Sequence, residues 1–482
     1  MFSDRATTTK ARLPRRPPAF ASNTLAGAHV LVLGLGASGK AAARLALACG
    51  ATCHGLDAGT GESLAERAAE LRHLGATVDL DWPPGKRLPA ADLIVISPGI
   101  AIGSAMGQQA CSTRAPVISE LEFGSRFCSC PLLAVTGTNG KTTTVELTTH
   151  LLSTAGLRVR SAGNIGLPLS ACAAESDQLD ALVVEVSSFQ LEAIDRFRPA
   201  AAALLNVTPD HYDRHGGPAP YLAAKLALFR NMPDASTMVF RHDLVAAPGI
   251  RELLRERTGA PLLFSPEPRA GCALFREAGT LCERQADGAV RHLLDVDELA
   301  LLGEHNVENA LAALALVRLA GQCPTQAALA LPTFQPSAHR LELVAEIDGV
   351  RFVNDSKATN VDAMCRALET VAATCQGPPV LLIAGGVDKD IDFSTALPKL
   401  EKHVRRAFLI GTCKGRLVKE WHDVVSCSEF LTLADAVSAA ASLAIPGDVV
   451  LLSPGCASQD MFRNYAHRGN EFRALVERRA RE

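Results

Sequence analysis

The sequence predicts an α/β protein made of parallel sheets covered by helices, and two observations support this fold class. Short apolar runs, such as His29–Leu33 and Leu132–Thr136, end in glycine-rich loops and are followed by helical stretches. Alternation of strands and helices is typical of parallel sheets with both faces covered. The composition is also that of a globular protein, with 48% hydrophobic and 21% charged residues.

Length, charge and cysteine pattern limit the function classes. At 482 residues, the chain has room for about three domains. The net charge of −3 gives no electrostatic reason to expect nucleic acid as a partner. We find no run of about 18 consecutive apolar residues, so we expect no membrane span. Fourteen cysteines without a Cys-x-x-Cys pair favour reduced thiols and a cytoplasmic location. Residues 1–24, basic and proline-rich, are expected to form a disordered tail.

The first block predicts a nucleotide-binding turn. The strand from His29 ends at Gly34-Leu-Gly36-Ala-Ser-Gly39, a helix follows, and Asp57 ends the next strand about 20 residues later. This is the dinucleotide-binding fingerprint of a Rossmann-like domain, in which glycines let the backbone approach a diphosphate. A tight strand–helix turn without a ligand is the alternative. The pattern alone does not distinguish NAD from another nucleotide diphosphate.

The second block contains a phosphate-binding loop. The strand Leu132–Thr136 leads into Gly137-Thr-Asn-Gly-Lys141-Thr142 and then a helix, although Val135 stands where the strict P-loop pattern has its first glycine. The loop amides can surround phosphates, Lys141 can neutralise the β/γ oxygens and Thr142 can bind Mg²⁺. A simple glycine turn is the alternative interpretation.

Three further positions follow buried strands or interrupt an apolar helix. Glu185 stands at the end of the buried strand Ala181–Val186. A buried carboxylate is costly unless it is paired or bound to a metal ion, so a Mg²⁺ ligand and a structural ion pair are both open interpretations. The loop with His211 and His215 matches no zinc spacing, and phosphate or Mg²⁺ contacts suit it better. Lys225 is a lone lysine in an apolar segment, and such lysines most often extend to solvent.

The rest of the chain gives weaker signals. Asn306 and Asn309 share a face of a helix that begins near Glu304, where they could bind a base edge or cap the helix. Pro332 and Pro336 bracket an expected hinge. Beyond it we expect a hairpin over 341–354 and strands at 380–383, 407–410 and 449–452.

Taken in order, these motifs resemble the Mur ligases. The resemblance rests on Thr-Gly-Thr-Asn-Gly-Lys-Thr-Thr, Glu-Val-Ser-Ser-Phe-Gln-Leu-Glu and Gly-x-His-Asn-x-x-Asn, and it covers about residues 25–480. In the third block, Asn-Asp-Ser-Lys-Ala-Thr-Asn, Gly-Gly-Val-Asp-Lys and Ser-Pro-Gly-Cys-Ala-Ser are similar to the members that add D-glutamate. The resemblance implies a Rossmann-like UDP-substrate-binding domain (25–122), a P-loop ATPase-like domain (123–336) and a Rossmann-like amino-acid-binding domain (337–482).

The resemblance also implies an activity. ATP would phosphorylate the terminal carboxylate of UDP-N-acetylmuramoyl-L-alanine, and the amine of D-glutamate would attack the acyl phosphate, in cytoplasmic peptidoglycan precursor synthesis. The expected cofactors are ATP, two Mg²⁺ ions and a carbamylated lysine. The expected form is a monomer without nucleic-acid partners. The alternatives are another Mur ligase, a folylpolyglutamate synthetase-like ligase, or an NAD-dependent oxidoreductase, which leaves the P-loop unexplained.

The resemblance assigns residues to each ligand. The UDP substrate is assigned Gly36, Ser38, Asp57, Ser97, Asn164 and His211. ATP is assigned Gly137, Thr138, Asn139, Gly140, Lys141, Thr142, Thr143, Asn306, Asn309, Arg340 and Asp355. D-Glutamate is assigned Lys357, Thr359, Lys389, Ser458 and Tyr465, where the family more often has Phe. The metal is assigned Thr142, Glu185, His211 and Lys225 as a carbamate; the catalytic residues implied are Lys141, Glu185, His211 and Lys225.

Overall fold

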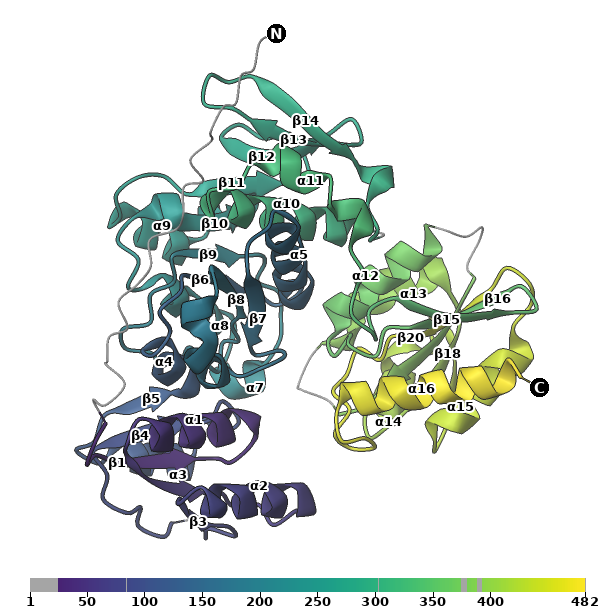
Figure 1. The fold of residues 1–482 in the computed structure, drawn as a ribbon. Coiled ribbons are helices and arrows are strands. Elements are labelled where there is room, and N and C mark those ends of the chain that lie inside the picture. The colour runs from purple at the N-terminus through teal and green to yellow at the C-terminus, as the bar shows by residue number, and fades with distance from the viewer. Residues whose placement is uncertain (1–24, 84, 302, 374–378, 388–391, 482) are drawn as a thin grey trace. The chain divides into compact units, whose positions relative to one another are not determined.

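The computed structural model describes residues 25–481 apart from 84, 302, 374–378 and 388–391 (Figure 1). The expected tail at 1–24 and the expected D-glutamate ligand Lys389 lie outside these residues. The chain divides into two compact units, which we describe separately. The first comprises Met1–Asn206, Ala219–Ala300 and Val307–Phe334, and the second comprises Val207–Pro218, Leu301–Asn306 and Gln335–Glu482.

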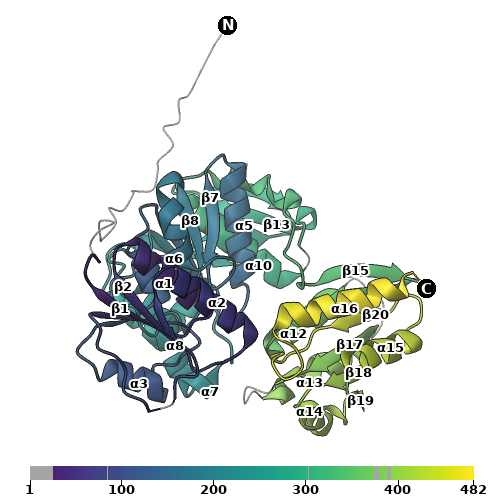
Figure 2. The ribbon, with the colours of Figure 1, turned by 60° about the horizontal axis from the view of Figure 1, so that its bottom comes forward.

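The first unit begins with a parallel sheet of strand order β3-β2-β1-β4-β5. Helices α1 and α2 pack on one face and α3 on the other (Figure 2). The strand order reverses between β1 and β4, and ligands bind at such switch points in open α/β sheets. The bounds are β1 His29–Leu33, α1 Ala37–Ala48, β2 Thr52–Leu56, α2 Glu62–His73, β3 Thr77–Asp79, β4 Leu93–Ile96, α3 Ala105–Cys111 and β5 Val117–Ser119.

The same unit contains a nine-stranded sheet of order β14-β13-β12-β11-β10-β9-β6-β8-β7. Strand β6 is buried at every position and pairs in parallel with β8 and β9, so the loops after these three strands meet at one edge. The strands are β6 Leu132–Thr136, β7 Val159–Gly163, β8 Ala181–Glu185, β9 Ala201–Leu204, β10 Met238–Arg241, β11 Leu262–Ser265, β12 Cys272–Glu277, β13 Thr280–Arg284 and β14 Val290–Asp295.

Helices of this region differ in how far they are buried. Helix α10 is buried on nearly all sides over its central turns, as expected from its run of alanine, leucine and valine. Helix α4 joins the two sheets and packs closely on α6, where a Cβ at Gly124 would lie 2.5 Å from the Ser170 amide nitrogen. The helices are α4 Glu120–Ser125, α5 Lys141–Thr154, α6 Leu169–Cys172, α8 Pro218–Leu226, α9 Pro248–Arg255, α10 Glu304–Leu319 and α11 Pro324–Ala328. The short helix α7, Tyr212–His215, belongs to the second unit.

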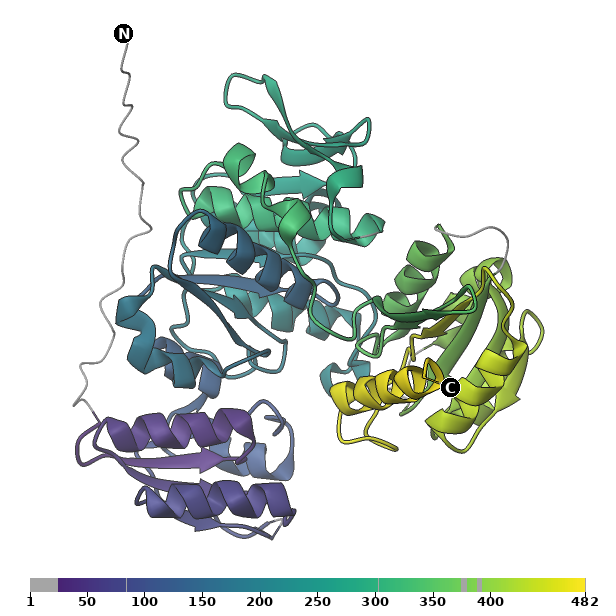
Figure 3. The same cartoon turned by 45° about the vertical axis from the view of Figure 1, so that its right-hand side comes forward.

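The second unit contains a six-stranded sheet of order β15-β16-β20-β17-β18-β19, parallel except for β15. Helices α12, α13 and α14 pack on one face, and α15 and α16 on the other (Figure 3). The bounds are β15 Glu342–Ile347, β16 Val350–Asn354, α12 Val361–Ala372, β17 Val380–Gly385, α13 Leu397–His403, β18 Val404–Ile410, α14 Lys414–Trp421, β19 Ser426–Glu429, α15 Leu433–Leu443, β20 Val449–Leu452 and α16 Tyr465–Arg479.

The expected α/β class is confirmed, and so is the hairpin, formed by β15 and β16. Strands β7 and β19 were not expected, because their sequences, Val-Arg-Ser-Ala-Gly and Ser-Cys-Ser-Glu, lack an apolar run. Both lie at sheet edges, where one neighbour suffices. Among the residues described, no helix is long and apolar enough to cross a bilayer.

Candidate active site

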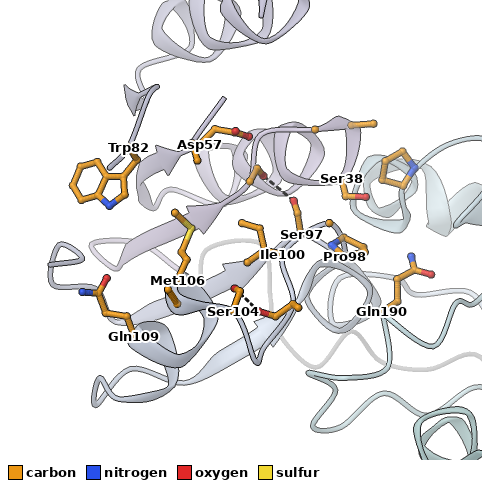
Figure 4. Close-up of a pocket in the computed structure, with 18 of the residues that line it drawn as sticks. Ser38, Asp57, Trp82, Ser97, Pro98, Ile100, Ser104, Met106, Gln109 and Gln190 are labelled. Carbon is orange, nitrogen blue, oxygen red and sulfur yellow. Dashed lines mark hydrogen bonds between the residues drawn. The ribbon is translucent and has the colours of Figure 1, made fainter. Parts of the chain in front are cut away.

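A cavity of about 820 Å³ lies at the switch point of the first sheet (Figure 4). The structure brings five expected UDP-substrate residues together in its lining: Gly36, Ser38, Asp57, Ser97 and Asn164. Asn164 belongs to the loop after β7, so the cavity extends from the first sheet to the second. Three further lining residues, Trp82, Met106 and Gln109, have no motif that would have identified them, and Gln190 lies in the Glu-Val-Ser-Ser-Phe-Gln-Leu-Glu motif but was given no role.

The glycine-rich turn has the geometry of the fingerprint. A Cβ at Gly39 would lie 1.8 Å from the carbonyl oxygen of Gly34, so only glycine lets α1 pack this closely against the end of β1. A Cβ at Gly36 would meet nothing within 4 Å. The backbone at Gly36 is therefore open to the cavity at the N-terminus of α1, where unpaired amides favour an anion.

Asp57 and Ser97 hold the turn in place. The Asp57 carboxylate accepts hydrogen bonds from the amides of Leu35 at 2.6 Å and Gly59 at 2.9 Å. The Ser97 hydroxyl donates to the Gly34 carbonyl at 2.7 Å (Figure 4). These bonds join the ends of β1, β2 and β4 around the cavity, so both side chains shape the turn as well as line it.

The P-loop between β6 and α5 is braced from the neighbouring strand. Gly137 and Gly140 have φ values of +155° and +82°, which favour glycine. The Asn206 side chain, just after β9, accepts from the amides of Thr138 and Asn139 at 3.1 and 2.9 Å and donates to the Asn139 carbonyl at 3.0 Å. Sequence reasoning missed this role of Asn206.

Glu185 is a buried carboxylate beside the P-loop. Its side chain is 2% exposed. It accepts hydrogen bonds from the Thr142 hydroxyl at 2.6 Å and from the Asn164 amide at 2.8 Å. Both donors are neutral, so within the described residues the structural ion-pair interpretation is wrong. Asn164 also lines the cavity, and it thereby connects the cavity to the P-loop through Glu185.

Lys225 does not extend to solvent, and the expectation based on its apolar segment alone is wrong. The side chain is 1% exposed. Its ammonium donates to the Gly137 carbonyl at 2.8 Å and lies 4.4 Å from the centre of the Tyr221 ring. Lys141 donates to the same carbonyl at 2.9 Å and to that of Thr138 at 2.7 Å. Two lysines therefore converge on one loop oxygen.

Other expected residues fall into different units. Asn309, in the first unit, accepts from the Thr144 hydroxyl at 3.3 Å, whereas Asn306 and His211 belong to the second unit. His211 has a positive φ of +55°, and its Nε2 lies 3.7 Å from the Asp210 carboxylate. Among the described residues, no group of three His, Cys, Asp or Glu side chains could hold a metal ion by itself.

The second unit brings together some of the expected D-glutamate and ATP residues. Lys357 donates to the Tyr465 hydroxyl at 2.9 Å. Thr359 is half-buried in the same loop, Ser458 is buried after β20, and Arg340 is half-buried before β15. Asp355 accepts from the Ser453 hydroxyl at 2.8 Å, and burial raises the pKa of its carboxyl to about 7.

Comparison with known proteins identifies the family. The Mur ligase middle domain matches residues 135–317, and the Mur ligase glutamate ligase domain matches residues 339–456. The UDP-N-acetylmuramoylalanine–D-glutamate ligase of Acidobacterium capsulatum is 39% identical, over 94% of this chain and 96% of that protein. The protein of the same name from Frankia casuarinae is 42% identical, over 95% of each chain.

Solved structures share the fold at low sequence identity. The Thermotoga maritima UDP-N-acetylmuramate-alanine ligase MurC matches with a TM-score of 0.58 and 18% identity, over 94% of this chain and 99% of that one. MurF from Acinetobacter baumannii matches with a TM-score of 0.59 and 16% identity, over 88% and 90%. With its P-loop, its cavity and relatives that match over nearly its whole length, the chain belongs to the Mur ligase family.

Proposed function

We propose that this enzyme is the ATP-dependent ligase that joins D-glutamate to UDP-N-acetylmuramoyl-L-alanine in peptidoglycan precursor synthesis, releasing ADP and phosphate. The relatives named for this reaction span almost the whole chain. One chain of hydrogen bonds gives the strongest structural support for the proposal. Asn164 lines the cavity that we assign to the UDP substrate and donates to Glu185 at 2.8 Å. Glu185 in turn accepts from the P-loop residue Thr142 at 2.6 Å.

The proposed reaction needs positioning and charge neutralisation more than a protein nucleophile. The substrate carboxylate attacks the γ-phosphate of ATP, which gives an acyl phosphate and ADP. The amine of D-glutamate then attacks the acyl carbon, and the tetrahedral intermediate collapses to the amide and phosphate. Lys141, at the start of α5 among the loop amides, is placed to stabilise charge on the transferring phosphoryl group. Because the chain belongs to this family of ligases, the alternative of an NAD-dependent oxidoreductase is disfavoured.

The residues beside the P-loop fit Mg²⁺. Glu185 is a buried carboxylate held by neutral donors, and the Thr142 hydroxyl lies 2.6 Å from it. Carboxylate and hydroxyl oxygens are the ligands that Mg²⁺ takes. When bound, the ion would neutralise phosphate charge. We propose that Glu185, Thr142 and His211 hold Mg²⁺, with Lys225 as a further ligand after modification, and that two ions bind.

The surroundings of Lys225 support its carbamylation. Its ammonium is buried and shares the Gly137 carbonyl with the ammonium of Lys141. Desolvation and a nearby like charge both favour a neutral amine. A neutral amine adds to CO₂ and loses one proton, which gives an anionic carbamate. The oxygen atoms of this carbamate suit a hard cation.

The remaining assignments are part of the same proposal. Asn306, Asn309, Arg340 and Asp355 would bind ATP, and Lys357, Thr359, Lys389, Ser458 and Tyr465 would bind D-glutamate. The Lys357–Tyr465 hydrogen bond of 2.9 Å supports placing these two residues together. The proposed form is a monomer in the cytoplasm, without nucleic-acid partners.

A substrate panel tests the proposal. Phosphate release is measured with ATP, Mg²⁺ and UDP-N-acetylmuramoyl-L-alanine against D-glutamate, L-glutamate, L-alanine and meso-diaminopimelate. We expect release with D-glutamate alone. Release with another amino acid would assign the enzyme to a different step of the family, and release with a folate acceptor in place of the UDP substrate would favour the folylpolyglutamate synthetase alternative.

A further inference from the structure

Arg468, in the first turn of α16, is a buried cation. Its side chain is 1% exposed, among the largest fully buried side chains of the described residues. Burial lowers the pKa of its guanidinium to about 10, so the group still carries its charge at neutral pH. A buried charge costs stability unless other interactions compensate for it, and its contacts therefore need an explanation.

The guanidinium connects two loops through neutral oxygens. Nε donates to the Ser356 hydroxyl at 3.0 Å, and Nη2 donates to the Ser356 carbonyl at 2.8 Å. Nη1 and Nη2 donate to the Cys456 carbonyl at 3.2 and 3.3 Å. The two carboxylates that act on Arg468 through space bond elsewhere: Asp355 to Ser453, and Asp460 to the Thr412 amide. No hydrogen-bonded anion neutralises Arg468 within the described residues.

These loops follow the neighbouring parallel strands β16 and β20. Ser356 directly precedes Lys357, and Cys456 lies two residues before Ser458. Further contacts join the same region, because the Gly455 amide donates to the Ala358 carbonyl at 2.9 Å and the Ser356 hydroxyl donates to the Tyr465 carbonyl at 2.8 Å. Arg468 therefore lies at the junction of the segments that carry Lys357, Ser458 and Tyr465.

We propose that Arg468 is a positioning residue for the amino-acid substrate, which clamps the loops 354–360 and 453–458 together and places a fixed positive charge behind them. This inference rests on the proposed function, in which these loops bind D-glutamate. The charge favours an amino acid with two carboxylates over one with a neutral side chain, because a cation without a paired anion acts strongly at short range in a low-dielectric interior. Arg468 thus contributes to selection for an acidic substrate without touching it.

The test compares Arg468→Met and Arg468→Lys with the wild type. Phosphate release is measured while D-glutamate, ATP and the UDP substrate are varied in turn, and D-glutamine serves as the neutral competitor of similar shape. We expect Arg468→Met to raise the KM for D-glutamate about tenfold or more, with the other two KM values unchanged. Its preference for D-glutamate over D-glutamine should fall. Arg468→Lys should retain more of that preference, since it keeps the charge.

A matched control comes from the same helix. Arg473 pairs with the Glu342 carboxylate at 3.1 Å, so Arg473→Met removes an arginine that is already neutralised and should leave the D-glutamate KM unchanged. ADP binding and melting temperature report whether each variant is folded. If Arg468→Met does not fold, the comparison rests on Arg468→Lys. Its KM for D-glutamate should rise, while its KM values for ATP and the UDP substrate should stay unchanged.

Three outcomes would overturn the proposal: a D-glutamate KM in folded Arg468→Met or Arg468→Lys that matches the wild type, a parallel rise of all three KM values, or equal D-glutamine preference in the Lys and Met variants. Failure of the proposed function itself is a separate result, because the wild type would then release no phosphate with D-glutamate.

Discussion

Single side chains in the P-loop region make contacts that restrict their chemistry. Glu185 accepts from two neutral donors, which leaves its negative charge without a paired cation among the described residues. Lys225 and Lys141 converge on one oxygen of the same loop, because both ammonium groups donate to the carbonyl of Gly137. A buried carboxylate and two converging lysines around one loop form the arrangement expected where phosphate charge and a metal ion are to be held.

The first prediction concerns Lys225. Lys225→Ala should be nearly inactive, because it removes the group that is proposed to become an anionic metal ligand. Chloride or acetate at millimolar concentration should partly restore phosphate release by supplying an anion at the vacated position. The measurement is turnover with and without each salt. Lys40→Ala is the control for general effects of the salts on turnover, because it removes a lysine of α1 that is paired with Glu70 of α2. Turnover of Lys225→Ala close to wild type without added anions would show that the lysine has no role in the reaction.

At the scale of elements, turns at strand ends determine the site. The P-loop is confined on both sides: Asn206 binds its amides from the end of β9, and α10 approaches its last glycine. A Cβ at Gly140 would lie 2.2 Å from the Asn309 side-chain oxygen, and the φ there is +82°. The loop and α10 are therefore fitted to each other at a position where only glycine is accommodated.

Gly140→Ala tests this fit. The added methyl group must displace Asn309 and strain a left-handed backbone, which costs roughly 1–3 kcal/mol. We expect ADP affinity to fall by about tenfold or more, since loop amides lose their alignment for phosphate, and the urea midpoint to decrease. Gly61→Ala is the matched control, because Gly61 also precedes a helix but has a φ of −65° and open space around its Cβ position. Unchanged ADP affinity in Gly140→Ala, measured by calorimetry, would contradict the tight fit.

At the scale of the whole molecule, one buried acid lies where the two sheets of the first unit join. Glu120 begins α4, is 0% exposed, and accepts from the Ser170 amide at 2.7 Å through Oε1. Its Oε2 has no hydrogen-bond partner in the part of the chain that the structure describes. Burial raises the pKa of this carboxyl to about 7. Below about pH 7, burial at this junction therefore favours the protonated carboxyl.

The raised pKa predicts a pH dependence of stability. An unfolded glutamate titrates near 4.5, whereas Glu120 in the folded protein titrates near 7. Between these values only the folded state holds the proton, so the contribution of Glu120 is complete below about pH 4.5 and is lost as pH rises through about 7. The loss is on the order of a few kcal/mol.

Melting temperatures across pH test this dependence. Glu120→Gln keeps the shape but does not titrate, so its melting temperature relative to wild type should rise between about pH 5 and pH 8. Glu66→Gln, on the exposed surface of α2, should follow the wild-type curve. A difference between Glu120→Gln and wild type that does not change with pH would show that Glu120 is ionised in the folded protein.

Much of the fold could be predicted from the sequence, because strands and turns are encoded locally. The apolar runs predicted β1, β6, β8, β17 and β20, and the glycines of both loops marked turns where a Cβ has no room, as at Gly39 and Gly140. The edge strands β7 and β19 escaped prediction, since their polar sequences carry no pattern and neighbouring strands hold them in place.

The sequence by itself determined which chemical groups are present and at which strand ends they stand. Only the tertiary structure decided which of them meet. The Thr142–Glu185 and Asn164–Glu185 hydrogen bonds depend on β8 lying between β6 and β7. The burial of Lys225 against Gly137, which overturned its expected exposure, depends on where its helix packs. Local periodicity encodes neither, because strand order and helix packing are set by side chains far apart in the chain burying their apolar surfaces together.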